Sequence, residues 1–502
     1  MSRRAAISVL VVVGVLASSC RSGQSLTNAG IARKSTPTVA STVPGQTTVP
    51  TAPPTTQPRK LDTLPRCDTS KLDQAGASGP VNITFWHGLS NELGRELERL
   101  TTVYNGQQHK VKVNLEFQGG YEQTIDKYLQ SNAANRPDMV QMPEYMVQQM
   151  IDTKSIVPTQ ACAESAKYDT ASFLPQALGA YATQGVQWSM PFNMSVPILY
   201  FLKPRFIAAG LDPENPPRSL EEFLAASKKI VSSGAASYSV SIDSDFDGGG
   251  GWYIEQWLAK AGEFYSDNEN GRAAPSTHVL YDGASGVKLL TYLQSLVTQG
   301  GAVYVGDNAS GTDSLLKLAD ATKPAAMTIA TSAALGPVLN ILGGGLIPGI
   351  TSNDVGVGPM PGPNNGKGAL VGGASLYIVD GKGAEKAAAV WDYMTFLESA
   401  ASQSQWAAAT GYIPVRNDAL ELDPIKNLYV RDPRFKVAYD QLTSSAPGPT
   451  SQGPVIGPHK AVRRVTATAV GVALSGGDVQ AALTKAAQAA NDLITNYNTQ
   501  NK

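Results

Sequence analysis

The chain has 502 residues, a formal net charge of −1 at pH 7 and 16% charged residues. Its basic residues form only short, isolated runs such as 460–464, which argues against a nucleic-acid-binding protein. Beyond residue 60, no apolar stretch reaches the roughly 20 residues that a membrane-spanning helix needs. The length that remains is enough for two domains.

The first 19 residues have the order of a secretory signal peptide. Two arginines precede an apolar run at 5–16, and small residues follow at 17–19. This run is too short to remain as a membrane span. Cys20 comes next, as in the bacterial lipobox, although Ala17 occupies a position that usually holds leucine. We expect lipidation of Cys20 and anchoring to the outer face of the cytoplasmic membrane; an exported protein with an unmodified thiol is the alternative.

Residues 20–60 are expected to form a lipidated cysteine followed by a disordered linker. After the cysteine they are almost entirely Ser, Thr, Pro, Gly, Gln and Ala, which bury too little apolar surface to offset the entropy of ordering. Such a tether reaches on the order of 100 Å from the membrane. A glycosylated stalk is the alternative, and it implies the same location.

Two further cysteines, Cys67 and Cys162, form an even pair in a chain expected to be exported. An oxidising compartment favours a disulfide between them, which would join the start of the folded region to a loop about 95 residues later. Two buried free thiols are the alternative.

Strands and helices alternate beyond residue 80, which predicts an α/β fold with a largely parallel sheet. β-Branched and aromatic residues indicate strands at 81–86, 111–117, 138–142, 325–329 and 374–379. Apolar residues at helical spacing indicate helices at 91–104, 121–132, 219–232, 284–299, 385–409 and 479–496.

Seven stretches, in the same order along the chain, carry a family resemblance. They are ITFWHGLSNELG at 83–94, NLEFQGGYEQT at 114–124, RPDMVQMPEY at 136–145, MPFNMSVPILYFLKPRFIAAGLDPENPPRSLEEF at 190–223, AAMTIATSAALG at 325–336, LVGGASLYIV at 370–379 and QWAAATGYIPVRNDA at 405–419. Together they resemble the extracellular solute-binding proteins (family 1) of carbohydrate-type ABC importers. Within that group the chain is most similar to the glycerol-phosphate-binding proteins.

The resemblance implies a two-lobed, periplasmic-binding-protein-like fold (type II) with hinge crossovers near 192–199, 328–332 and 379–386. Lobe one is then expected at 80–192 plus 328–380, and lobe two at 193–327 plus 386–500. The ligand would lie between the lobes, and hinge closure would signal the loaded state to the permease subunits of an ABC importer. A monomeric binding protein, with no enzymatic activity and no cofactor, follows from the same resemblance.

Matching positions imply ligand contacts at Tyr121, Glu144, Ser195, Ser332, Gly373 and Tyr412. Each has a structural alternative: a turn tyrosine, a solvated carboxylate, a hydroxyl that caps local backbone, a strand bulge or a packed phenol. Trp252, after four glycines, is a further candidate because an indole stacks on the apolar face of a sugar; core packing is its alternative. Trp86 and His87 also match, but Trp86 ends a core strand and is expected to be structural.

One position departs from the group. Glycerol-phosphate binders carry an arginine two residues before a glycine in the late segment, whereas Val455 stands there in this chain. Arg463 and His459 are near in sequence but displaced. A buried phosphate dianion without a fixed cation is costly. We therefore expect a sugar, a polyol, or a glycerophosphodiester whose charge stays near solvent.

The remaining motifs are weaker. The acids of 243–247 imitate the start of a calcium loop, but position twelve is Ile254, so a flexible acidic loop is expected. Four scattered histidines and the absence of HExxH give no reason to expect a metal.

Two alternative functions remain. A secreted glycan-active enzyme would need a second carboxylate facing Glu144. A receptor lipoprotein without a transport role is the other alternative.

Overall fold

The computed structural model describes residues 63–76, 79–247, 249–307, 312–342 and 349–501. The chain divides into Met1–Ala52 and Pro53–Lys502, and every element below belongs to the second unit. The expected signal peptide, the lipidation site at Cys20 and the linker lie outside the described residues.

The first sheet has the strand order β2-β1-β3-β13-β4, with β7 also paired to β13. Its strands are β1 (Val81–His87), β2 (Val111–Phe117), β3 (Met139–Pro143), β4 (Ile156–Val157), β7 (Met190–Ser195) and β13 (Gly372–Val379). β1 is parallel to β2 and β3, whereas β13 is antiparallel to β3, β4 and β7. The expected parallel pairing therefore holds for β1 to β3 only, because β13 enters the sheet from its opposite end.

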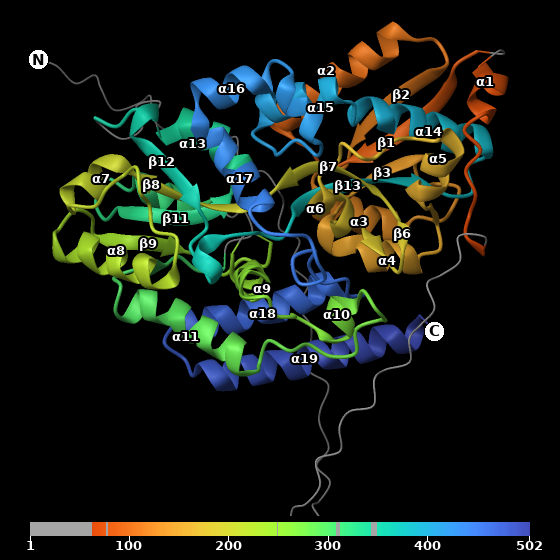
Figure 1. Ribbon diagram of the computed structural model, residues 1–502. Coiled ribbons are helices and arrows are strands. Elements are labelled where there is room, and N and C mark those ends of the chain that lie inside the picture. The colour runs from red at the N-terminus through yellow and green to blue at the C-terminus, as the bar shows by residue number, and fades with distance from the viewer. Residues whose placement is uncertain (1–62, 77–78, 248, 308–311, 343–348, 502) are drawn as a thin grey trace, which may run out of the picture. The chain divides into compact units, whose positions relative to one another are not determined.

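The second sheet has the order β10-β9-β11-β8-β12. Its strands are β8 (Pro197–Leu202), β9 (Tyr238–Ile242), β10 (Val303–Tyr304), β11 (Ala325–Thr331) and β12 (Val355–Pro359). The buried apolar residues form two main cores: one holds Phe85 and Leu376 of the first sheet and extends to Tyr200 of the second, and the other holds Val240 and Met327 of the second. The molecule is thus a two-lobed α/β protein (Figure 1).

Sheet membership differs from the expected lobe boundaries at two places. Only Val196 separates β7 of the first sheet from β8 of the second, within the crossover expected at 192–199. However, β11 and β12 both pair within the second sheet, whereas the expected boundary at 328 falls inside β11 and assigns β12 to lobe one. The helix α14 (Ala384–Leu397), expected in the second lobe, packs on β1 and β13 of the first sheet. Hydrogen bonding between distant strands decides this membership, and no local pattern encodes it.

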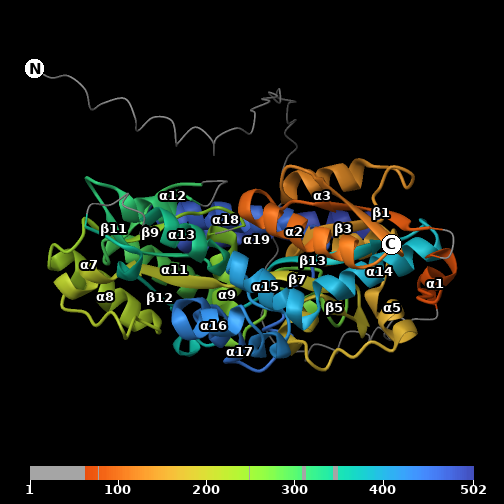
Figure 2. The same cartoon turned by 90° about the horizontal axis from the view of Figure 1, so that it is seen from above.

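Helices cover the faces of both sheets. The first sheet is covered by α2 (Asn91–Gln107), α3 (Tyr121–Gln130) and α14. Beside the second sheet pack α7 (Lys203–Ala208), α8 (Leu220–Ser232), α9 (Gly250–Ala261), α11 (Ala284–Thr298), α18 (His459–Leu474) and α19 (Val479–Gln500), the last two drawn in blue (Figures 1 and 2). Shorter helices complete the fold: α1 (Lys71–Gly76), α4 (Val147–Asp152), α5 (Thr159–Ala166), α6 (Pro175–Ala180), α10 (Asp267–Gly271), α12 (Asp313–Leu316), α13 (Leu335–Leu342), α16 (Ile425–Arg431) and α17 (Val437–Thr443).

The single helix expected at 385–409 is two helices. α14 ends at Leu397, and α15 (Ala400–Thr410) begins after two intervening residues. Ser399 is the N-cap of α15: its extended backbone leaves the helix, and its hydroxyl accepts a hydrogen bond from the Ser402 amide. Alanines lie on both sides of the break, and their helix propensity makes 385–409 resemble one helix in the sequence.

The structure contains the expected disulfide between Cys67 and Cys162, whose Cα atoms are 4.8 Å apart. Cys162 lies in α5 and is fully buried. The bridge fixes the segment that precedes β1 onto the first lobe.

Candidate ligand-binding pocket

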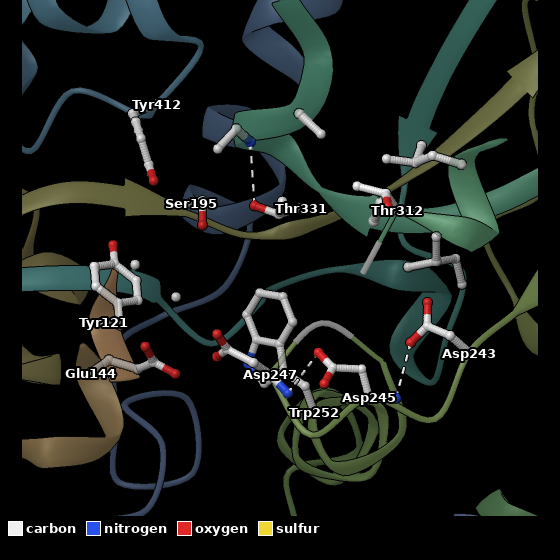
Figure 3. A pocket seen from close by; sticks show the side chains of 17 residues that line it. Tyr121, Glu144, Ser195, Asp243, Asp245, Asp247, Trp252, Thr312, Thr331 and Tyr412 are labelled. Atoms are coloured by element: carbon white, nitrogen blue, oxygen red, sulfur yellow. Dashed lines mark hydrogen bonds between the residues drawn. The ribbon is translucent and has the colours of Figure 1, made fainter. Parts of the chain in front are cut away.

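Side chains from both lobes enclose a cavity of about 280 Å³ (Figure 3). Its lining residues follow the ends of strands: Glu144 comes directly after β3, Ser195 ends β7, and Thr331 ends β11. Strand ends at the junction of two lobes are where α/β proteins place small-molecule sites. The geometry therefore marks this cavity as the candidate site.

Six of the seven predicted contact residues line the cavity: Tyr121, Glu144, Ser195, Trp252, Gly373 and Tyr412. Ser332, the seventh, lies outside the lining and is 2% exposed. Its amide donates to the Val196 carbonyl over 2.8 Å, and the Val196 amide donates to its hydroxyl over 3.3 Å. Ser332 thus joins the two sheets at the crossover, while its neighbours Thr331 and Ala333 face the cavity. That the six bind a ligand stays a prediction.

Tyr121 is positioned by a sharp turn and by two buried amides. Gly119 and Gly120 have φ of +98° and +144°, and they lead from β2 into α3, which begins at Tyr121. Asn193 donates from Nδ2 to the Tyr121 hydroxyl over 2.7 Å, and Gln141 donates to the Asn193 side-chain oxygen over 2.7 Å. Because both amides are fully buried, the phenol oxygen is held at a fixed point of the wall.

Tyr412 joins the same network from the opposite side. It follows Gly411, which ends α15 in the left-handed conformation with φ of +79°. Its hydroxyl lies near Asn193 and Tyr121, and burial raises the pKa of its phenol against the lowering effect of these two side chains. Two phenols from distant segments therefore present one neutral, hydrogen-bonding surface.

Glu144 faces a buried guanidinium. Arg463 of α18 donates to Glu144 over 2.9 Å, and to both oxygens of Glu255 over 2.9 and 2.8 Å. The side chains of Arg463 and Glu255 are only 2% and 1% exposed. Burial raises the pKa of Glu144 to about 7 against the lowering effect of Arg463. Burial also acts to raise the pKa of Glu255, but Arg463 and then His459 outweigh it and bring the pKa to about 2.

The acidic segment at 243–247 contributes three more carboxylates to the cavity. Asp243 and Asp245 are 2% and 3% exposed, whereas the side chain of Asp247 is 44% exposed. Burial raises the pKa of Asp243 to about 6 against the lowering effect of Ser314, and the charge of Asp245 reinforces the rise. A Cβ at Gly249 would lie 1.8 Å from an Asp243 carboxylate oxygen, so packing requires glycine there.

Sequence reasoning missed these three aspartates as site residues. They directly follow β9, whose residues YSVSI alternate between polar and apolar. Acids at the carboxyl end of such a strand were the available signal, since strand ends line the clefts of α/β proteins. Arg463 was noted only as displaced, and the fold turns α18 so that it reaches Glu144.

Trp252 of the second lobe packs against Gly372 of the first, and Gly373 follows it. A Cβ at Gly372 would lie 2.6 Å from Cζ2 of Trp252, so the indole rests on bare backbone. Gly373 has φ of +97°, and a Cβ there would lie 1.9 Å from the Asn193 carbonyl oxygen. Backbone geometry and packing therefore explain both glycines without reference to a ligand.

Val455, at the position of the family's arginine, is 3% exposed and belongs to the first hydrophobic core rather than to the cavity lining. Trp86 donates from its indole to Glu116 over 2.8 Å, outside the lining. Burial lowers the pKa of His87 to about 4, which keeps its imidazole neutral.

The parts of the chain that the structure describes contain no group of three His, Cys, Asp or Glu side chains arranged to hold a metal ion. Over the same residues, no helix is long and apolar enough to cross a membrane.

Relatives of the chain are binding proteins. The sn-glycerol-3-phosphate-binding periplasmic protein UgpB of Pectobacterium atrosepticum is 30% identical over 415 residues, which are 81% of this chain and 89% of that protein. UgpB of Escherichia coli O6:K15:H31 is 27% identical over 434 residues, covering 84% of this chain and 94% of the relative.

Solved structures share the fold. UgpB from Mycobacterium tuberculosis in complex with glycerophosphocholine has a TM-score of 0.66 at 20% identity, covering 83% of this chain and 99% of its own. The cyclic alpha-maltosyl-1,6-maltose binding protein from Arthrobacter globiformis has a TM-score of 0.67 at 20% identity. The match covers 83% of this chain and 100% of that protein's chain. The family model for bacterial extracellular solute-binding proteins matches residues 100–436. The chain therefore belongs to the bacterial extracellular solute-binding protein family.

Proposed function

We propose that this protein captures a sugar, a polyol or a glycerophospho-compound in the cavity and delivers it to the permease of an ABC importer. The observation that carries the proposal is the composition of the cavity wall. Two neighbouring phenols, four carboxylates and an indole, contributed by both lobes, surround a space of about 280 Å³. Hydroxyl-rich solutes need such hydrogen-bonding groups together with an aromatic face.

Contacts from both lobes support a hinge-closing mechanism. A solute bound by Tyr121 and Glu144 on one side and by Trp252 on the other stabilises the closed arrangement, which a permease can distinguish from the empty one. The proposed lobes follow sheet membership: about 81–195 with 372–415, and about 197–359 with 437–500. The single residue Val196 and the segment between β12 and β13 would then be the hinge.

The proposal includes export and anchoring, as a monomer held at the membrane. The small residues before Cys20 and the Ser/Thr/Pro-rich linker support a lipoprotein on the outer face of the cytoplasmic membrane. Replacing the thiol by Cys20→Ser should move the protein from the membrane fraction to the medium. Retention of this variant in the membrane fraction would contradict lipid anchoring.

A glycan-active enzyme is the competing proposal, because the cavity holds Asp247 as well as Glu144, and hydrolysis needs two carboxylates. Family membership and the ion pair that commits Glu144 to Arg463 favour binding. Incubation with nitrophenyl glycosides distinguishes the two: we expect no release of nitrophenol above the rate of a denatured control.

Thermal unfolding of the full chain against a panel of sugars, polyols and glycerophosphodiesters tests the proposal. A ligand at 100 times its Kd adds about 2.7 kcal/mol to the free energy of unfolding, which for this chain length is a shift of a few degrees in Tm. Tyr412→Ala should abolish that shift. The matched Tyr439→Ala variant, outside the cavity, should retain it. A panel without any shift would contradict solute binding and favour a receptor role.

A further inference from the structure

We propose that Lys460 and Arg464 of α18 form an ionic latch with Glu122 of α3, which holds the two lobes closed and sets the solute affinity from outside the cavity. This inference rests on the proposed function and names three positioning residues for the same site. It is carried by ion pairs that cross from one lobe to the other and by the place of Glu122 next to Tyr121.

The latch residues belong to opposite lobes. α18 packs on α9 and α11 of the second lobe, whereas α3 packs on β1 and β3 of the first. Lys460 Nζ lies 2.6 Å from Oε2 of Glu122, and Arg464 donates to the same oxygen over 2.8 Å. Rotation of one lobe against the other changes both distances, so the two pairs depend directly on closure. None of the three residues is among those that line the cavity.

Glu122 depends on these two cations. Its other oxygen, Oε1, is buried and accepts no hydrogen bond among the described residues. A carboxylate that leaves water needs a counter-charge, and the two cations offset the cost of partly burying Glu122 when the lobes meet. The pairs therefore stabilise the closed arrangement rather than either lobe alone.

Arg464 is positioned within its own lobe before the first lobe meets it. Its guanidinium carbon lies 4.7 Å from the centroid of the Phe246 ring, which also belongs to the second lobe. The side chains of Arg464 and Glu122 are 53% and 36% exposed. Water can therefore replace this pair at small cost when the lobes open, as a reversible latch requires.

A buried contact between the lobes differs in this respect. Arg272, 9% exposed, donates to the carbonyls of Gly179 and Ala182 in the first lobe over 2.8 and 2.7 Å. It also donates to the Gly453 carbonyl in the second lobe over 2.8 Å. Separation here would leave buried polar groups without partners, which is costly. Arg272 therefore serves as a fixed point of the interlobe contact, and the pairs at Glu122 are the part that opens.

The latch is coupled to the predicted solute contacts through α3. Glu122 directly follows Tyr121 in the first turn of this helix, and Asn193 fixes the Tyr121 hydroxyl in the cavity wall. Because a solute contacts both lobes only in the closed arrangement, a shift in the closing equilibrium changes its apparent affinity. A latch that favours closing thus tightens binding without contacting the solute.

Spin labels on the two lobes test the latch without any solute. The full chain with Cys20→Ser carries one label at Glu98→Cys of α2 and one at Lys485→Cys of α19, both of which are exposed. In about 0.01 M salt the distance between the labels should be short and narrowly distributed. In about 1 M salt it should lengthen, because the screening length falls from roughly 30 Å to roughly 3 Å.

Substitutions then identify the pairs responsible. Lys460→Gln with Arg464→Gln should lengthen the distance at both salt concentrations, and Glu122→Gln should do the same. All three substitutions together should have no larger effect than Glu122→Gln, since partners in one interaction are not additive. The matched control is Lys203→Gln, which removes a 3.0 Å pair with Glu214 within the second lobe and should change nothing.

Calorimetric titration connects the latch to affinity. The probes are glucose, maltose, glycerol and glycerophosphocholine. A probe that binds the wild type should bind the Lys460→Gln, Arg464→Gln variant about three- to tenfold more weakly, as expected for two partly exposed ion pairs. The difference should shrink at about 1 M salt, and Lys203→Gln should bind as the wild type does.

The other outcomes separate this inference from the proposed function. Equal label distances in the wild type and the Lys460→Gln, Arg464→Gln variant overturn the latch and leave the proposed function standing. Longer distances without any loss of affinity overturn its control of binding. Additive effects of the three substitutions overturn direct pairing with Glu122. If no probe binds the wild type and the thermal panel is silent, the proposed function fails, and the label distances still decide whether the latch exists.

Discussion

At the scale of single residues, Arg463 has the largest structural role in the site. It is buried against Glu255, and both side chains are nearly inaccessible to water. Replacing it by Arg463→Met leaves a buried carboxylate without a counter-charge, which we expect to cost about 3–5 kcal/mol in the free energy of unfolding. Arg464→Met is the matched control: Arg464 is 53% exposed and pairs with Glu122, so its loss should cost less than about 1 kcal/mol. Urea denaturation measures both, and equal losses would contradict the buried pair.

Glu144 gives the site a pH-dependent stability. Its pKa is raised from 4.5 to about 7 in the folded protein, so the folded state binds the proton more tightly than the unfolded state. The stability linked to this group is present at low pH and is lost as pH rises from about 4.5 through 7. Glu144→Gln cannot ionise, so relative to wild type it should gain about 1–3 kcal/mol between pH 5 and pH 8. Urea titrations at the two pH values test this prediction. If the free energy of unfolding of Glu144→Gln changes with pH as much as that of the wild type, the prediction is contradicted. The exposed Glu98→Gln is the control and should show the same pH dependence as the wild type.

At the scale of elements, β13 begins with glycines because its neighbours leave no room. A side chain at Gly373 suffers both a positive φ and contact with the Asn193 carbonyl, whereas Gly381, with φ of +78°, has open space around its Cβ. Gly381→Ala should therefore cost about 1 kcal/mol, from backbone strain alone. Gly373→Ala should cost at least about 2 kcal/mol, since β13 or β7 must also shift. Chemical denaturation compares the free energies of unfolding of the two variants. Similar losses would show that the contact with Asn193 adds nothing to the cost of backbone strain.

At the scale of the whole molecule, the disulfide ties the start of the folded chain to the first lobe across 95 residues of sequence. In the loop-entropy model such a bridge contributes about 4.5 kcal/mol by restricting the unfolded chain. The double variant Cys67→Ser, Cys162→Ser should lose roughly that amount and melt several degrees lower. Reductant should lower the Tm of the wild type and leave the variant unchanged. A wild type insensitive to full reduction would contradict this contribution.

The sequence predicted the elements well where the pattern is local. Alternation of β-branched residues located β1 and β2, and helical spacing located α2, α8 and α11. It failed at Ser399, where an N-cap divides an alanine-rich stretch into two helices. The lobe boundary that the resemblance places at 328 falls inside β11, whereas β11 and β12 both pair with β8 of the second sheet, more than a hundred residues away.

What the sequence by itself determined is the class of the protein and most of the cavity wall, because the stretches that carry the family resemblance also carry eleven of its 17 lining residues, Tyr121 and Tyr412 among them. Only the tertiary structure decided the charge of the site. The aspartates of 243–247 and Glu144 are about a hundred residues apart, and Arg463 is more than two hundred further on. The folding of two sheets brings their side chains together and removes them from water, and neither effect is a property of any single segment.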